Sequence, residues 1–163
     1  MANPNQIISS QLAILQQVLQ EYVVSINGTV GVASNVQDLW YQSSQSSQKP
    51  IIYICYAGET AWSNSNLSAL THRVSRNWIV RVKQGRGVTA RRGDTVLEFV
   101  TIVEEVRDVL RTMQGISQDF GIDYEGTKYV RLGDSVMDAY DIAFSTKNDL
   151  PQILQIPDDS NLN

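Results

Sequence analysis

The side chains best suited to catalysis or metal binding are few in this sequence. It contains one cysteine, Cys55, and one histidine, His72, which together cannot form the Cys/His cluster of a zinc site. No Gly-x-Ser-x-Gly elbow supports a serine nucleophile. Cys55 lies in the apolar run 51–56, a setting typical of a buried structural thiol. We therefore predict no catalytic residue, no metal site and no cofactor.

Other short motifs are equally weak. Gly85 and Gly87 have the spacing of the first two glycines of the dinucleotide-binding motif, but the third glycine of that motif is missing, since the next glycine is Gly93. Asp134, Asp138 and Asp141 are candidate cation ligands. Alternation along a strand, however, places the last two on opposite faces, which favours solvated carboxylates. These motifs give no support for an enzyme.

Arginine and lysine instead gather in one segment. Residues 61–92 hold seven of the chain's 13 basic residues and no acidic one, whereas all 17 acidic residues lie elsewhere. The segment therefore carries +7 and the remainder −11. This polarity suits docking to an acidic partner, self-association or a passing polyanion, although a solvated strand face explains it equally well. The seven residues are Arg73, Arg76, Arg81, Lys83, Arg86, Arg91 and Arg92.

The basic residues are carried by a strand and a loop. Over 73–83, the apolar side chains Val74, Trp78, Val80 and Val82 alternate with polar ones. We expect the second set, with Arg81 and Lys83, to form a positive row on the exposed face of a half-buried strand. A Gly/Arg-rich loop, 84–93, follows.

The elements around this strand follow from periodicity and turn residues. Apolar residues at helical spacing predict a helix over 5–24, which ends with Gly28 in a left-handed conformation. Residues 42–48, Ser and Gln only, predict a flexible polar loop, and 51–56 predict a strand. A second helix is expected over 95–113, with Thr95 and Glu98 as a capping box and Gly115 as its stop.

The last third predicts two strands and a tail. Residues 127–132 and 136–144 read as strands joined by a turn at Gly133-Asp134, and 148–163 as an extended C-terminal tail. The chain is thus expected to form one α+β domain over 1–147. Its mainly antiparallel sheet of four to five strands has two helices packed on one face. No apolar run reaches the ~20 residues that span a bilayer, so we expect a soluble protein made without export.

This order of elements resembles the tail-terminator (tail-completion, minor tail) proteins of long-tailed bacteriophages. The resemblance rests on the helix 7–23, the strands 51–56 and 78–83, the loop 85–93, the helix 95–113 and the strand 140–145. It covers most of residues 5–147. The resemblance implies a virion protein that assembles in the host cytoplasm as a homohexameric ring. Such a ring caps the tail tube, stops its polymerisation and offers the surface to which the head-closure or connector protein attaches. Phage DNA passes through it without sequence-specific binding.

Under this hypothesis, the positive segment has two possible roles. Its side chains line the channel near DNA, or they contact acidic surface on the tail tube or the next subunit. Because several phosphate contacts would grip the DNA that must pass, we favour protein contacts for most of them. The candidate interface or channel residues are Arg73, Arg81, Lys83, Arg86, Arg91 and Arg92. Another phage neck protein, or a monomeric adaptor that binds an acidic partner, stays open as an alternative.

Overall fold

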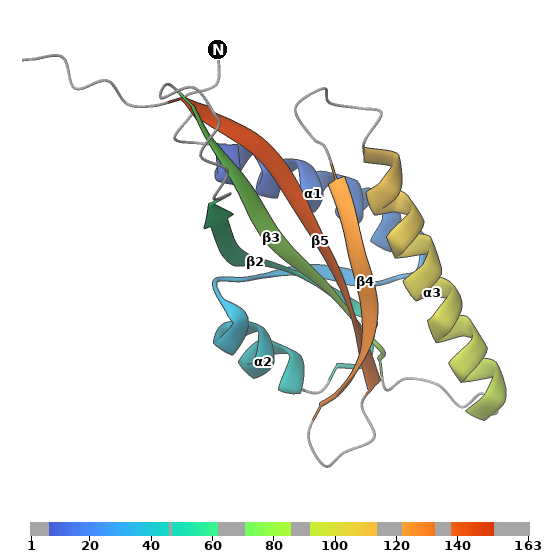
Figure 1. The fold of residues 1–163 in the computed structure, drawn as a ribbon. Coiled ribbons are helices and arrows are strands. Elements are labelled where there is room, and N and C mark those ends of the chain that lie inside the picture. The colour runs from blue at the N-terminus through green and yellow to red at the C-terminus, as the bar shows by residue number, and fades with distance from the viewer. Residues whose placement is uncertain are drawn as a thin grey trace, which may run out of the picture.

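A computed structural model describes residues 7–45, 47–61, 71–85, 92–113, 122–132 and 138–151 (Figure 1). The predicted α+β class is confirmed, with a five-stranded sheet and, in the described part, three helices where two were expected. The helices are α1 (Ile7–Ser25), α2 (Val36–Ser44) and α3 (Arg92–Thr112). The strands are β1 (Thr29–Ala33), β2 (Ile51–Ala61), β3 (Thr71–Lys83), β4 (Ile122–Arg131) and β5 (Asp138–Pro151).

The strands lie in the order β1-β2-β3-β5-β4. Three neighbouring pairs are antiparallel, as predicted, but β1 and β2 are parallel, so the sheet is mixed. The chain leaves β1 and returns to β2 through α2, and a crossover of this kind joins parallel strands. β1 was not predicted because it is only five residues long and contains a glycine, Gly31. A glycine is needed at this position because a Cβ atom there would lie 2.9 Å from the ring of Tyr53.

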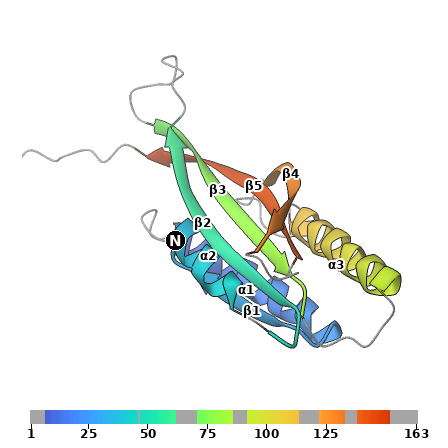
Figure 2. The same ribbon diagram turned by 90° about the horizontal axis from the view of Figure 1, so that it is seen from below.

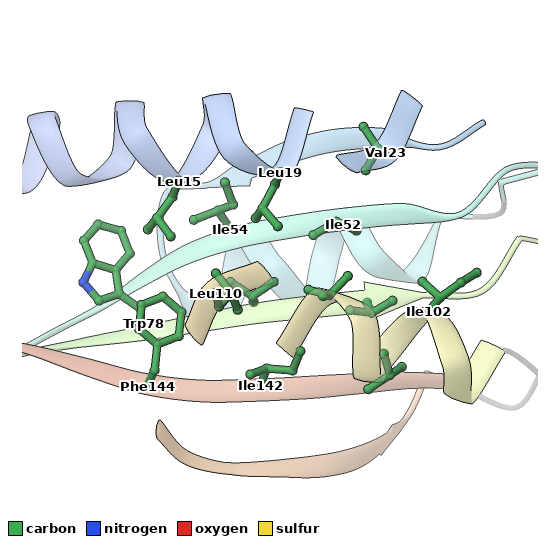
Figure 3. Close-up of a cluster of buried hydrophobic side chains, with 14 of the residues drawn as sticks. Leu15, Leu19, Val23, Ile52, Ile54, Trp78, Ile102, Leu110, Ile142 and Phe144 are labelled. Carbon is green, nitrogen blue, oxygen red and sulfur yellow. The ribbon is translucent and has the colours of Figure 1, made fainter. Parts of the chain in front are cut away.

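Helices α1 and α3 cover one face of the sheet, as expected (Figure 2). The apolar side of β3 faces these helices, and all four side chains predicted to lie there are buried. Figure 3 shows Trp78 beside Phe144 among leucine and isoleucine side chains from both helices and from strands β2 and β5. The main core comprises Leu15, Leu19, Val23, Ile52, Ile54, Trp78, Val80, Val82, Phe99, Ile102, Val103, Val106, Leu110, Met113, Ile122, Ile142 and Phe144.

Helix α2 covers part of the opposite face, where no helix was predicted. Its first turn is capped by Asn35, whose side chain accepts a hydrogen bond from the Asp38 amide at 2.8 Å. Leu39 and Ser43, four residues apart, are completely buried. The expected polar loop over 42–48 is therefore wrong for its first three residues, which belong to α2. The low-complexity composition concealed a helix that uses a serine at a buried position.

Three further expectations need correction. The helix α3 begins at Arg92, so Thr95 lies inside it and is not its cap. Strand β5 runs to Pro151, so residues 148–151 are strand and not tail. Asn27, with φ of 54°, takes the left-handed conformation after α1 in place of Gly28. Gly28 has another role, because a Cβ there would lie 2.9 Å from the Pro50 carbonyl oxygen.

Some predictions fall outside the described residues. These are the helix stop at Gly115, the turn at Gly133-Asp134 and the tail from residue 152 onward. Most of the loop 84–93 is also outside, since only its two ends, 84–85 and 92–93, are described.

Candidate interaction surface

The positive residues of β3 do not form an exposed row. Arg81 is 2% exposed and Lys83 is completely buried. They do lie on the sheet face opposite Val80 and Val82, as the alternation predicts, but α2 packs over that face. The expectation that these two side chains are exposed is therefore wrong. Arg73 lies in β3 and Arg92 at the start of α3, but the structure does not describe the side chain of either residue. Arg86 and Arg91 lie outside the described residues.

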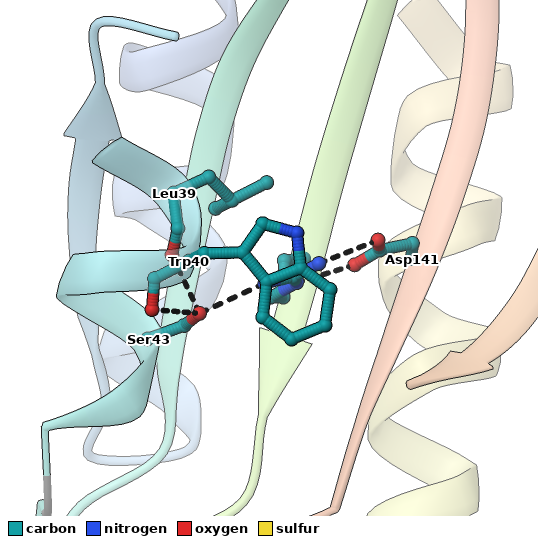
Figure 4. A network of polar contacts seen from close by, with 5 residues as sticks. Leu39, Trp40, Ser43 and Asp141 are labelled. Atoms are coloured by element: carbon teal, nitrogen blue, oxygen red, sulfur yellow. Dashed lines mark hydrogen bonds and ion pairs between the residues drawn. The ribbon is translucent and has the colours of Figure 1, made fainter. Parts of the chain in front are cut away.

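Arg81 joins β3 to both β5 and α2 (Figure 4). Its Nε and Nη2 donate to the two carboxylate oxygens of Asp141 at 2.7 and 2.8 Å, which is a bidentate ion pair. Its Nη1 donates to Ser43 Oγ at 2.8 Å. The Trp40 ring stacks over the guanidinium, with its centroid 4.6 Å from Cζ. The arginine thus fixes α2 on the sheet.

Lys83 and Tyr53 hold the end of the same helix. Lys83 Nζ donates to the carbonyl oxygen of Gln45, the C-cap residue of α2, and the Tyr53 hydroxyl donates to the Gln42 carbonyl at 3.2 Å. Burial raises the pKa of Tyr53 and of the neighbouring Cys55 thiol, which keeps both groups protonated at neutral pH. Cys55 is thus a buried thiol within a structural cluster, and not a nucleophile in its thiolate form.

A third basic residue of β3 points to the other face. Arg76 shares the parity of Val74 and Trp78, so it lies on the α1/α3 side, and it is 2% exposed. Its Nε is 3.6 Å from Glu59 Oε2 on the neighbouring strand β2. Three of the seven positive residues are therefore internal and contact groups of the same subunit.

Large apolar side chains are exposed in a group on each of two opposite sides of the sheet, and Val24 of α1 and Leu97 of α3 are exposed as well. On one side, α2 presents Val36, Trp40 and Tyr41, which are 41%, 45% and 70% exposed. On the other side, the edge strand β4 presents Tyr124 and Tyr129, which are 46% and 49% exposed. Neither group was predicted from the sequence: α2 was not expected, Tyr124 lies before the predicted strand 127–132, and the exposure of Tyr129 within that strand was not foreseen. Their one sequence signal was aromatic residues in otherwise polar stretches.

The outer surface of the helix layer is acidic. Glu98, Glu104, Glu105 and Asp108 on α3 are all exposed, and Glu105 Oε2 accepts a hydrogen bond of 2.6 Å from the Tyr22 hydroxyl of α1. Burial, together with this carboxylate, raises the pKa of Tyr22. The hydrogen bond ties the two helices together at the acidic surface.

Within the described ranges, no three His, Cys, Asp or Glu side chains gather where they would hold a metal ion. None of the described helices is long and apolar enough to span a membrane. No protein-family model matches this sequence, and no curated protein matches it either. The described residues present two unlike apolar groups on opposite sides of the sheet and an acidic helix layer.

Proposed function

We propose that this protein is a structural virion protein that forms a ring on the end of a phage tail tube. The ring stops tube polymerisation and provides the surface for head attachment, as the resemblance of the sequence to tail-terminator proteins implies. It needs no catalytic residue and no cofactor. DNA passes through its centre.

The observation that carries this proposal is the pair of unlike apolar surfaces on opposite sides of the sheet. Strand β4 ends the sheet on one side, whereas α2 contacts β1 and β2 on the other. A head-to-tail contact joins one such surface to the other on the next subunit, and it gives a closed ring when the rotation closes. Exposed aromatic side chains are the type that protein interfaces enrich. A monomer has no evident use for two of these surfaces.

The mass of the purified protein in solution tests the ring. A ring predicts a species of six subunit masses, which native mass spectrometry or sedimentation would report. Tyr41→Glu and Tyr129→Glu should each shift this species toward the monomer, because each places a charge in one of the two apolar surfaces. Gln20→Glu, at an exposed position on α1, adds the same charge elsewhere and should leave assembly unchanged.

Capping is tested separately with tail tubes grown in the presence of the protein. The wild-type protein should give tubes of uniform length that join heads, and the two tyrosine variants should give overlong, unjoined tubes. A protein that stays monomeric at all concentrations and does not alter tube length would contradict the proposal. That result would favour a monomeric adaptor.

A further inference from the structure

The outer edge of β4 carries no further strand in the described part of the chain. A bulge at Gly126, with φ of +140°, interrupts its pairing with β5, so the regular run is residues 127–131. An exposed edge of this length accepts an added strand, because backbone N–H and C=O groups along it point outward.

A groove lies beside this edge, between α3 and the sheet. Its lining comprises Val100, Val103, Glu104 and Arg107 of α3 together with Tyr124, Thr127 and Tyr140. Side chains on alternate positions of an added strand would point into this groove. The two valines and the two tyrosine rings offer apolar contacts to such side chains, so the edge suits a segment that is apolar at every second residue.

We propose that the C-terminal segment of a neighbouring copy, Ile153-Leu154-Gln155-Ile156, adds as a strand to residues 127–131 of β4. Leu154 and Ile156 share one face of an extended chain and would fill the groove, and Pro157 then ends the strand. That the occupant is a second copy rests on the ring proposed above.

The segment cannot reach the β4 edge of its own subunit. Thr127 pairs with Ile142, which lies nine residues before Pro151 in β5. Nine residues of strand span about 30 Å. Ile156 comes only five residues after Pro151, and five residues reach at most about 18 Å even when fully extended. A contact between this segment and residues 127–131 therefore has to join two subunits.

Charge sets the direction of the added strand. Asp123 and Glu125 lie at the beginning of β4, whereas Lys128 and Arg131 lie toward its end, and all four are exposed. Two aspartates, Asp158 and Asp159, follow the apolar segment. A strand parallel to β4 brings them next to the basic end, and an antiparallel one brings them next to the acidic end. The segment thus runs parallel to β4.

Crosslinking between two variants, each with one added cysteine, tests this contact. Thr127→Cys is placed in one preparation and Ile156→Cys in another, and the two are mixed with a short bismaleimide. The native Cys55 is completely buried and gives little background. Covalent dimers should form in the mixture and be absent from either preparation alone. A mixture of Gln20→Cys, at an exposed α1 position, with Ile156→Cys should also give none.

Full-length variants give a second measurement. Leu154→Asp/Ile156→Asp should raise the concentration for half-assembly at least about tenfold, whereas the control Gln152→Asp/Ser160→Asp should not. Lys128→Glu/Arg131→Glu should weaken assembly, and adding Asp158→Lys/Asp159→Lys should restore it.

The outcomes separate the two proposals. A wild-type protein without any oligomer overturns both the ring and this contact. A wild-type ring that gives no crosslink at Thr127, and that assembles equally well with the Leu154→Asp/Ile156→Asp substitutions, overturns the contact alone. A third variant that carries both Thr127→Cys and Ile156→Cys, and that forms a crosslink only within one chain, would overturn the intermolecular assignment.

Discussion

Replacement of Asp141 by alanine should destabilise the protein far more than an ordinary surface substitution. The substitution leaves the Arg81 guanidinium, which is 2% exposed, without its carboxylate partner. Removing one member of a buried ion pair costs about 3–5 kcal/mol. Because the Asp141 side chain itself is 17% exposed, we expect the lower end of this range, about 3 kcal/mol.

Urea unfolding measures this cost. With a slope of about 2 kcal/mol per molar urea, a loss of 3 kcal/mol lowers the midpoint by roughly 1.5 M. All variants are compared at one protein concentration, since assembly adds to apparent stability. Hydrogen exchange should also accelerate in α2, because Arg81 holds that helix through Ser43.

Asp108→Ala provides the matched control. Asp108 also contacts arginines, at 3.3 Å to Arg107 and 3.9 Å to Arg111, but its side chain is 59% exposed. Exposed ion pairs contribute about 0–1 kcal/mol. Equal midpoints for Asp141→Ala and Asp108→Ala would refute the idea that the Arg81 pair fixes α2. The double variant Arg81→Met/Asp141→Leu should lose less stability than Asp141→Ala, since no charge is then left buried without a partner.

Two further predictions concern the core and pH. Trp78→Ala should lower the free energy of unfolding by about 3–5 kcal/mol, because Trp78 is completely buried. Tyr41→Ala, at an exposed position, should change it little. Equal melting temperatures for the two variants would contradict this prediction. Hydrogen bonds from the Ser34 amide and hydroxyl lower the pKa of Asp38. The stability that these bonds add is therefore complete at neutral pH and is lost as the pH falls through that lowered pKa. The protection factor of the Ser34 amide, which is the exchange rate of an unstructured amide at the same pH divided by its own, should therefore fall in acid, and Asp38→Asn should remove this pH dependence.

Long periodic segments of the sequence predict the fold well. The stripes of α1 and α3 and the alternation in β3 each extend over more than ten residues, and each element was found. The short elements β1 and α2 were missed because five and nine residues give too few repeats to reveal a period. Ser43, buried with its hydroxyl bonded to the Leu39 carbonyl, further weakened the apolar signal.

The candidate site illustrates a different limit. Alternation assigns Arg81 and Lys83 to the face opposite Val80, and this assignment is correct. Whether that face meets water depends on what covers it, and the cover is supplied by α2 from more than thirty residues away. A local pattern thus predicts the side of the sheet, but burial follows from tertiary packing.

The internal positions of Arg76, Arg81 and Lys83 narrow the roles open to the positive segment. Their charges are engaged by Glu59, Asp141 and a helix C-cap, so they are unavailable to DNA or to another subunit. Any interface or channel role of the positive segment in the proposed ring therefore rests on Arg73, Arg86, Arg91 and Arg92, while the exposed part of α3 is acidic. Fewer cations at the surface mean fewer phosphate contacts and a weaker hold on DNA. Weak binding of DNA suits a ring through which DNA must pass, since a channel wall that repels phosphates or does not bind them does not retain the genome.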